Sequence, residues 1–221
     1  MVKHFNHVKI PALDFELEAV TLESGRTYTT PQGNVYKSIT TALSKYNKHA
    51  IQEWRNAVGE EEAKRVSGLA SRRGTAVHLV FEDYIANKLN DMKIRMLMPN
   101  IKELFQQLKP EIDEHVGTVY SIEQALYSDR LQVAGRSDLI AEWDNEIAVI
   151  DYKTSTKEKL EENIQNYFMQ GAAYALMFEE LVGTPINKIV IAIAVEESKR
   201  PQIFVRYKKN YINPLMELLN G

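Results

Sequence analysis

The sequence predicts an α/β fold in which a mixed β-sheet is flanked by helices. Apolar residues up to position 109 recur mostly at helical spacing, whereas residues after Pro110 are rich in β-branched and aromatic types. The predicted strands do not alternate regularly with helices, as they would in a fully parallel sheet. No glycine-rich phosphate-binding motif follows a predicted strand, so neither a dinucleotide site nor a P-loop is expected.

The N-terminal part is expected to form a small hairpin and then a helix. Residues 21–36 contain two short segments around Pro-Gln-Gly-Asn at 31–34, a composition typical of a turn. Ser38 and Thr40 both have side chains that cap helices, and a helix is predicted from about Thr41.

Helical spacing continues from there to residue 109. Gly59 and Gly74 are expected to interrupt it. Pro99 and Pro110 are expected to bound a separate helix, because proline suits the first turn of a helix and disrupts its interior.

The C-terminal part is expected to carry most of the sheet. Three strands are predicted first, at residues 118–127, 133–143 and 146–152. Asp144 and Asn145 have the turn chemistry that joins the last two strands as a hairpin. A helix is predicted over 157–180, then a buried strand at 188–195, a further strand at 201–207 and a short closing helix.

Two parts are predicted within one compact domain. Residues 1–110 form the hairpin and a helical region that includes His78, and residues 111–221 form the strand-rich core. Hydrophobic residues make up 44% of the 221 residues and charged residues 26%, enough apolar material for a globular core. Cysteine is absent, which excludes a disulfide framework and a cysteine-held zinc or iron–sulfur site.

Charge and targeting signals narrow the function classes. Lys and Arg number 27 against 30 acidic residues, so a phosphate-binding surface must be local. The N-terminus resembles neither a secretory signal nor a transit peptide, and no apolar stretch is long enough to span a membrane. We therefore expect a cytoplasmic protein without membrane contact.

Asp138, Asp151 and Lys153 form the most informative polar group. Asp151 and Lys153 are two residues apart on a predicted strand, so their side chains point to the same face. Asp138 lies on the neighbouring strand and comes close if the hairpin forms. Two carboxylates can hold a hard divalent cation that activates water for phosphodiester hydrolysis, and an ammonium stabilises the developing charge. Taken alone, however, an Asp–Lys pair at a strand end is commonly a surface salt bridge.

Four short motifs occur in order along the chain. They are GTAVH at 74–78, GRSD at 135–138, DYKT at 151–154 and QGAAY at 170–174. Together they resemble the motifs of the PD-(D/E)xK nucleases in their RecB-like branch. The segments 38–44, 53–55, 59–63 and 72–75 are similar to phage exonucleases and to the mitochondrial genome maintenance exonuclease, so the resemblance covers most of the chain from Ser38 onward.

The resemblance implies a restriction-endonuclease-like core with an N-terminal helical annex. It also implies a metal site formed by His78, Asp138, Asp151 and the backbone carbonyl of Tyr152, with Lys153 as the catalytic lysine. One or two Mg²⁺ or Mn²⁺ ions are expected, and a histidine ligand favours Mn²⁺. Several relatives carry an iron–sulfur cluster, which this chain cannot hold without cysteine. Without the resemblance, His78 is better interpreted as an ordinary histidine on a helix face.

The second half of the motif set implies groups that assist the reaction. Gln170 and Tyr174 lie four apart, hence on one helical face, and the resemblance places them beside the scissile strand. A core tyrosine bonded to a neighbouring glutamine is the alternative. Whether Glu123 or Glu82 adds a carboxylate to the metal site stays open.

Several residues are candidates for contacts with DNA. Basic side chains neutralise phosphates and small hydroxyls bond them, although Ser38 and Thr40 also suit helix capping. The candidates are Arg72, Arg73, Arg136, Ser38 and Thr40.

The expected function is metal-dependent exonuclease action on free ends of single-stranded DNA. Such an enzyme serves DNA repair, recombination or replication, in the host cytoplasm if the chain is of phage origin. A helicase, polymerase or single-strand-binding protein is an expected partner. The alternatives are a structure-specific or flap endonuclease on the same core, and a non-catalytic DNA-binding recombination module.

Overall fold

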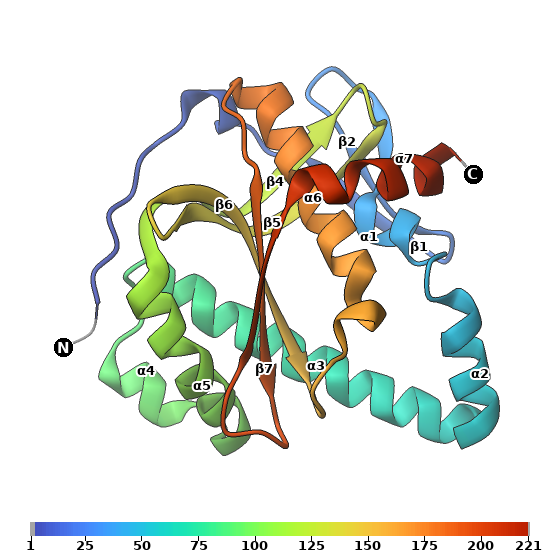
Figure 1. Ribbon diagram of the computed structural model, residues 1–221, viewed down its shortest axis with the longest axis vertical. Coiled ribbons are helices and arrows are strands. Elements are labelled where there is room, and N and C mark those ends of the chain that lie inside the picture. The colour runs from blue at the N-terminus through green and yellow to red at the C-terminus, as the bar shows by residue number, and fades with distance from the viewer. Residues whose placement is uncertain (1–2, 221) are drawn as a thin grey trace.

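The computed structural model describes residues 3–220, which form one eight-stranded sheet with helices on both faces (Figure 1). The strands are β1 (Glu18–Leu22), β2 (Gly25–Thr29), β3 (Val35–Ser38), β4 (Val116–Ser128), β5 (Val133–Trp143), β6 (Glu146–Ser155), β7 (Lys188–Val195) and β8 (Gln202–Tyr207). The helices are α1 (Ile39–Leu43), α2 (Lys48–Val58), α3 (Glu60–Ile85), α4 (Asp91–Met96), α5 (Pro99–His115), α6 (Gln165–Val182) and α7 (Ile212–Asn220). Short 3₁₀ turns lie at Pro11–Leu13, Glu161–Ile164 and Lys208–Asn210. The mixed α/β class is confirmed.

The sheet divides at β5. One edge of β5 pairs with β4 along its whole length, in antiparallel orientation. The opposite edge is shared, because β3 pairs with Val133 and Ala134 in parallel, and β6 pairs with β5 only from Leu139 to Trp143. Residues 135–138 lie between these two pairings. We call this stretch of β5 the sheet fork, and it positions the polar groups described below.

The two faces of the sheet are buried by different helices, with the sheet between α6 and the pair α3–α5 (Figure 1). Val149 of β6 packs with α6, whereas its neighbour Ile150 packs with α3 and α5. This alternation is the period of two that a strand imposes on its side chains. Every residue of β7 is buried, as predicted for a central strand.

Several local predictions are confirmed. Asp144 and Asn145 have φ angles of 53° and 62°, the left-handed conformation of a tight hairpin turn between β5 and β6. Ser38 caps α1, since its side chain accepts a hydrogen bond from the Thr41 backbone N–H. The turn at 31–34 joins β2 to β3, although β1 extends this hairpin into three strands. Because β3 pairs with β5, strands from both predicted parts share the sheet, and the division at residue 110 stays a prediction.

Three predicted boundaries were wrong. Helix α5 continues through Pro110 to His115, because Leu108 and Ile112 keep its buried face intact on both sides of the proline. Helix α3 runs through Gly74 without interruption. Helix α6 begins at Gln165 and not at 157, since an extended segment and a 3₁₀ turn come first. No helix within residues 3–220 is long and apolar enough to cross a membrane.

Candidate metal centre and active site

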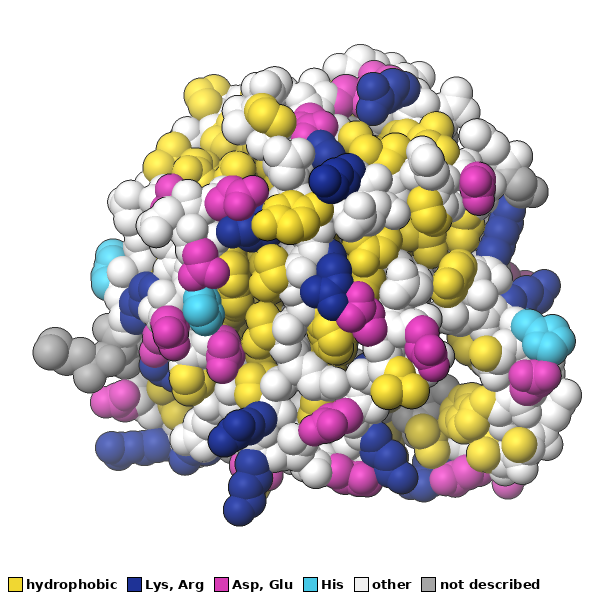
Figure 2. Space-filling view, viewed as in Figure 1, with side chains coloured by type: hydrophobic (Ala, Val, Ile, Leu, Met, Phe, Trp, Pro, Cys, Tyr) yellow, Lys and Arg dark blue, Asp and Glu magenta, His cyan; other side chains and the backbone are white. Residues whose placement is uncertain are grey.

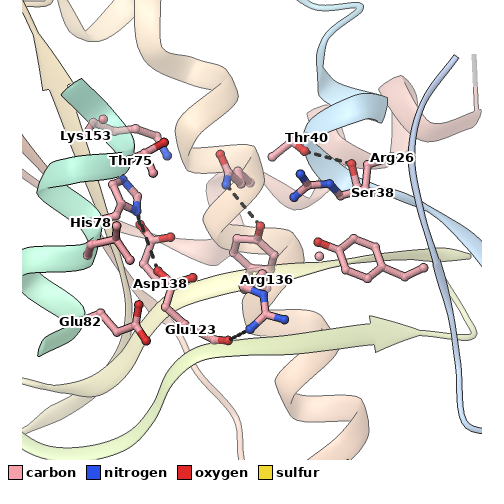
Figure 3. Close-up of a pocket in the computed structure, with 16 residues that line it drawn as sticks. Arg26, Ser38, Thr40, Thr75, His78, Glu82, Glu123, Arg136, Asp138 and Lys153 are labelled. Atoms are coloured by element: carbon pink, nitrogen blue, oxygen red, sulfur yellow. Dashed lines mark hydrogen bonds and ion pairs between the residues drawn. The ribbon is translucent and has the colours of Figure 1, made fainter. Parts of the chain in front are cut away.

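A pocket of about 530 Å³ opens beside the sheet fork (Figure 3). One wall is α3, and the opposite wall comes from β2, β3 and α1. The floor is formed by β4, β5, β6 and α6. Its polar lining residues are Arg26, Ser38, Thr40, Thr75, His78, Glu82, Glu123, Arg136, Asp138, Lys153, Gln170 and Tyr174.

His78, Glu123 and Asp138 bring three ligand atoms together within 4.8 Å of one another. The Nδ1 atom of His78 lies 3.5 Å from Asp138 Oδ2 and 3.9 Å from Glu123 Oε1. Donor atoms that share one ion at about 2.1 Å are about 3 to 4.2 Å apart. The separations therefore fit groups that converge on one divalent cation.

Glu123 reaches this cluster through a distortion of β4. It lies opposite Asp138, between the pairs Ile122–Leu139 and Gln124–Ser137. Its φ angle is 46°, which few residues other than glycine adopt. Arg136 donates a hydrogen bond to the carbonyl oxygen of Glu123 and so holds the distorted backbone. The sequence left this carboxylate undecided because a distortion of this kind has no pattern in the residue types.

Asp151 and Lys153 lie on the same face of β6, as predicted, and form an ion pair. Asp151 is only 1% exposed; its Oδ2 atom contacts the Lys153 ammonium, and its Oδ1 atom has no hydrogen-bond partner within residues 3–220. Burial raises the pKa of Asp151 to about 6, although the charge of Lys153 opposes this. A buried carboxylate oxygen without a hydrogen bond is energetically costly, and a bound cation would remove that cost.

Asp138 connects this pair to the cluster. Its Oδ2 atom accepts a hydrogen bond of 2.9 Å from the backbone N–H of Tyr152, between Asp151 and Lys153. The ring of Tyr152 stacks on Phe81 of α3 with centroids 4.8 Å apart. The sheet fork thus places the polar groups of α3, β4, β5 and β6 around one pocket.

Comparison with known families agrees with this geometry. A family model for the PD-(D/E)XK nuclease superfamily matches residues 96–209, more than half of the chain. The chain belongs to the PD-(D/E)XK nuclease superfamily. No curated protein matches it.

Superfamily membership supports a hydrolase that acts on DNA with a divalent metal. The matched segment of this nuclease contains Glu123, Asp138, Asp151 and Lys153. His78 lies outside it, so its place in the site rests on the geometry of α3 against the sheet. The backbone carbonyl of Tyr152 stays a predicted ligand.

The same side chains attract a proton when no cation is present. Burial alone lowers the pKa of His78, but its contacts with Asp138 and Glu123 outweigh this and raise the pKa to about 10. Burial also lowers the pKa of Lys153, yet attraction by Asp151 and Asp138 leaves it above its ordinary value. A cation must therefore displace a proton from His78.

This competition predicts how cleavage by the nuclease depends on pH. His78 must lose its proton and Asp151 must stay ionised, so the affinity for Mn²⁺ should rise as pH increases from 6 towards 10. At limiting Mn²⁺ the cleavage rate should rise over the same window, and excess Mn²⁺ should move the curve to lower pH. Initial rates at several pH values and two Mn²⁺ concentrations measure this, and a curve that excess metal leaves in place contradicts it.

Tyr174 of α6 reaches the pocket because Gly135 lets it approach β5. A Cβ atom at Gly135 would lie 2.8 Å from Cε1 of Tyr174 and 3.0 Å from Ile39 Cγ2. The Tyr174 hydroxyl accepts a hydrogen bond of 3.3 Å from Gln170. Because Gln170 is the donor, the tyrosine proton stays available to donate into the pocket.

Gly135→Ala should therefore damage both stability and cleavage. The added methyl group forces Tyr174 or Ile39 to shift, and overpacking of this kind costs about 1–3 kcal/mol. Cleavage should fall more than the loss of folded protein explains, since Tyr174 leaves its place in the pocket. Thermal unfolding and cleavage rates measured on one preparation separate the two effects. A double variant with Tyr174→Phe tests whether the lost hydroxyl position accounts for the activity loss.

The predicted DNA-contact residues occupy different settings. Arg136 and Thr40 line the pocket, and Arg72 is exposed on α3. Ser38 is 2% exposed and its hydroxyl bonds the residues of the α1 cap. Arg73 is held by other side chains of the protein.

Arg26 of β2 lines the pocket wall opposite α3, and the sequence did not point to it. Its Nε atom donates to Thr21 Oγ1 at 3.1 Å. Residue spacing gave no signal for Arg26, because only the pairing of β3 with β5 brings the N-terminal strands to the pocket.

Proposed function

We propose that the nuclease is a divalent-metal-dependent exonuclease that hydrolyses phosphodiester bonds from free ends of single-stranded DNA. The observation that carries the proposal is that the His78–Glu123–Asp138 cluster and Lys153 line one pocket, with Asp151 buried beside Lys153. A binding module has no use for a buried carboxylate oxygen without a hydrogen bond beside a lysine.

Different residues of the pocket suit different steps of the hydrolysis. His78, Glu123, Asp138 and Asp151 would hold one or two ions, with Mn²⁺ favoured by the imidazole and Mg²⁺ also accepted. A bound ion would neutralise phosphate charge and lower the pKa of the attacking water. Lys153 presents its ammonium beside Asp151, where it stabilises the charge that builds on the phosphate oxygens. Tyr174 and Gln170 orient the phosphate from the α6 side.

Single-stranded substrate suits the shape and charge of the molecule. The pocket lies between α3 and the β2–α1 wall, and a flexible single strand bends into such a recess more readily than a duplex. Figure 2 shows Lys and Arg interspersed with Asp and Glu, so this face does not offer a broad basic surface for duplex DNA. Arg72, Arg136 and Thr40 are the proposed phosphate contacts, and the resemblance to exonucleases supports action from an end.

Digestion of matched DNA substrates tests the proposal. End-labelled linear single strands, the same sequence as duplex, and a circular single strand are incubated with Mg²⁺, Mn²⁺, Ca²⁺ or a chelator. Release of short products from the linear single strand, with the circle left intact, is expected with Mg²⁺ or Mn²⁺ only. Cutting of the circle would show an endonuclease, and no cutting of any substrate with either metal would remove the enzymatic proposal.

A further inference from the structure

Arg73 of α3 connects this helix to the ends of two strands. Its Nε atom donates to Thr154 Oγ1 of β6 at 3.2 Å, and its terminal nitrogen donates to Thr156 Oγ1 at 3.3 Å. The same nitrogen forms an ion pair with Glu196, which directly follows β7. Thr156 in turn donates to the Glu196 carboxylate at 3.2 Å. The Arg73 side chain is 12% exposed, whereas Thr156 and Glu196 lie at the surface, so the bond to Thr154 is the most shielded of these contacts.

The connection lies between the two halves of the active site. His78 is five residues after Arg73 on α3, about 7.5 Å along the helix axis. Lys153 directly precedes Thr154 on β6. Gly74 passes close to the same point, because a Cβ there would lie 3.8 Å from Thr154 Oγ1. Arg73 therefore bonds β6 at the place where α3 approaches it.

Other contacts of α3 involve different parts of the fold, and Tyr84 donates a hydrogen bond to Asp113 of α5. Val77 and Phe81 pack in the apolar layer beneath the sheet, where Phe81 stacks on Tyr152. Apolar contacts hold the helix against the sheet, although the hydrophobic effect itself is not directional. The hydrogen bonds and ion pair of Arg73 are directional, and they fix the position of His78 along the helix axis relative to β6.

We propose that Arg73 and Glu196 are a positioning pair that aligns His78 on α3 with Lys153 on β6, and that Arg73 does not contact DNA. This proposal rests on the proposed nuclease function. Two features separate Arg73 from the neighbouring Arg72. The Nε atom and one terminal nitrogen of Arg73 are engaged by side chains of the protein, and the adjacent Glu196 carboxylate repels a phosphate. Arg72 is exposed and free of ion pairs within residues 3–220, as a phosphate contact requires.

Substitution of Glu196 distinguishes the two roles. A positioning role predicts slower cleavage by the variant, whereas a phosphate-contact role predicts tighter binding of DNA. If Arg73 positions α3, Glu196→Ala removes the ion pair and lowers kcat, with KM for DNA unchanged. If Arg73 contacts phosphate, the same substitution frees the guanidinium and lowers KM. Arg73→Met, which keeps the apolar stem and removes every donor, should lower kcat about tenfold or more, the range seen when supporting groups of metal ligands are lost. Arg73→Lys restores one donor and should recover part of kcat.

Mn²⁺ affinity, measured by titration calorimetry, gives a readout that does not need cleavage. Arg73→Met and Glu196→Ala should each weaken Mn²⁺ binding about tenfold, because His78 loses its alignment with Asp138. The double variant should bind Mn²⁺ as tightly as either single variant does, since each single substitution already removes the same ion pair. Arg65→Gln breaks an exposed ion pair on the same helix and should leave both Mn²⁺ affinity and kcat unchanged.

Arg72→Met provides the contrast with a phosphate contact. It should raise KM and reduce the salt dependence of DNA binding by about 0.7 in slope, without any change in Mn²⁺ affinity. If Arg73→Met behaves in this way, or if the Arg73 and Glu196 variants bind Mn²⁺ as the wild type does, the positioning proposal is overturned. Wild-type protein that cuts no DNA overturns the proposed function instead, and the Mn²⁺ affinities then still decide the positioning role.

Discussion

Lys153→Ala is expected to lower the cleavage rate by about a hundred- to a thousandfold while the protein still binds Mn²⁺ and DNA. Loss of a single positioned donor for developing oxyanion charge typically costs about 10²- to 10³-fold. Lys153 is the ammonium paired with Asp151 at the pocket, and its removal also leaves Asp151 without a cation beside it. The pKa of Asp151 should rise further, because Lys153 currently lowers it. Single-turnover cleavage at saturating Mn²⁺ measures the loss.

A second lysine close to β6 provides the control variant for this prediction. Lys157, just beyond the end of β6, is exposed, and Lys157→Ala should cleave as the wild type does. DNA binding in Ca²⁺ and thermal unfolding show whether the Lys153 variant is folded. Cleavage at the wild-type rate by Lys153→Ala would remove this lysine from the mechanism.

Asp138→Asn is expected to abolish both cleavage and the stabilisation of the protein by Mn²⁺. Asparagine keeps an oxygen for the Tyr152 N–H, so the fold should survive, but it lacks the charge that a cation requires. For the wild type, Mn²⁺ at a hundred times its Kd should stabilise the folded state by about 2.7 kcal/mol. The unfolding temperature of the variant should not respond to Mn²⁺, as measured by scanning calorimetry with and without the ion.

Two glutamates give a matched comparison for this result. Glu123→Gln removes a carboxylate from the His78 cluster. It should reduce the rise in unfolding temperature that Mn²⁺ causes, without abolishing it. Glu82 lines the same pocket but lies outside the cluster, so Glu82→Gln should leave this rise unchanged. Equal responses of the two variants would argue against Glu123 as a ligand.

The sequence predicted best what depends on local geometry. The shared face of Asp151 and Lys153 follows from the period of two in a strand, and the Asp144–Asn145 turn follows from the residues that tolerate positive φ. The prediction that a helix ends at Pro110 was wrong. Burial of the apolar face of α5 outweighs the free-energy cost of a proline inside the helix.

What the sequence could not predict depends on contacts between distant segments. The distortion that brings Glu123 to His78 arises from pairing across β4 and β5. The bonds of Arg73 to Thr154 and Glu196 exist only once α3 has packed on the sheet, so residue type alone could not predict them. Residue type predicts which chemistry is available, but burial and partners determine its use.

The parallel pairing of β6 with β7 has a consequence for the newly made chain. β6 carries Asp151 and Lys153, and in register they lie beside Ile191 and Ile193 of β7, which is synthesised later. Helix α6 must first form the crossover between the two strands. A ribosome-bound chain that ends before β7 therefore has no neighbouring strand to hold these two side chains in place, and the capacity to cut DNA arises only after synthesis has passed that strand.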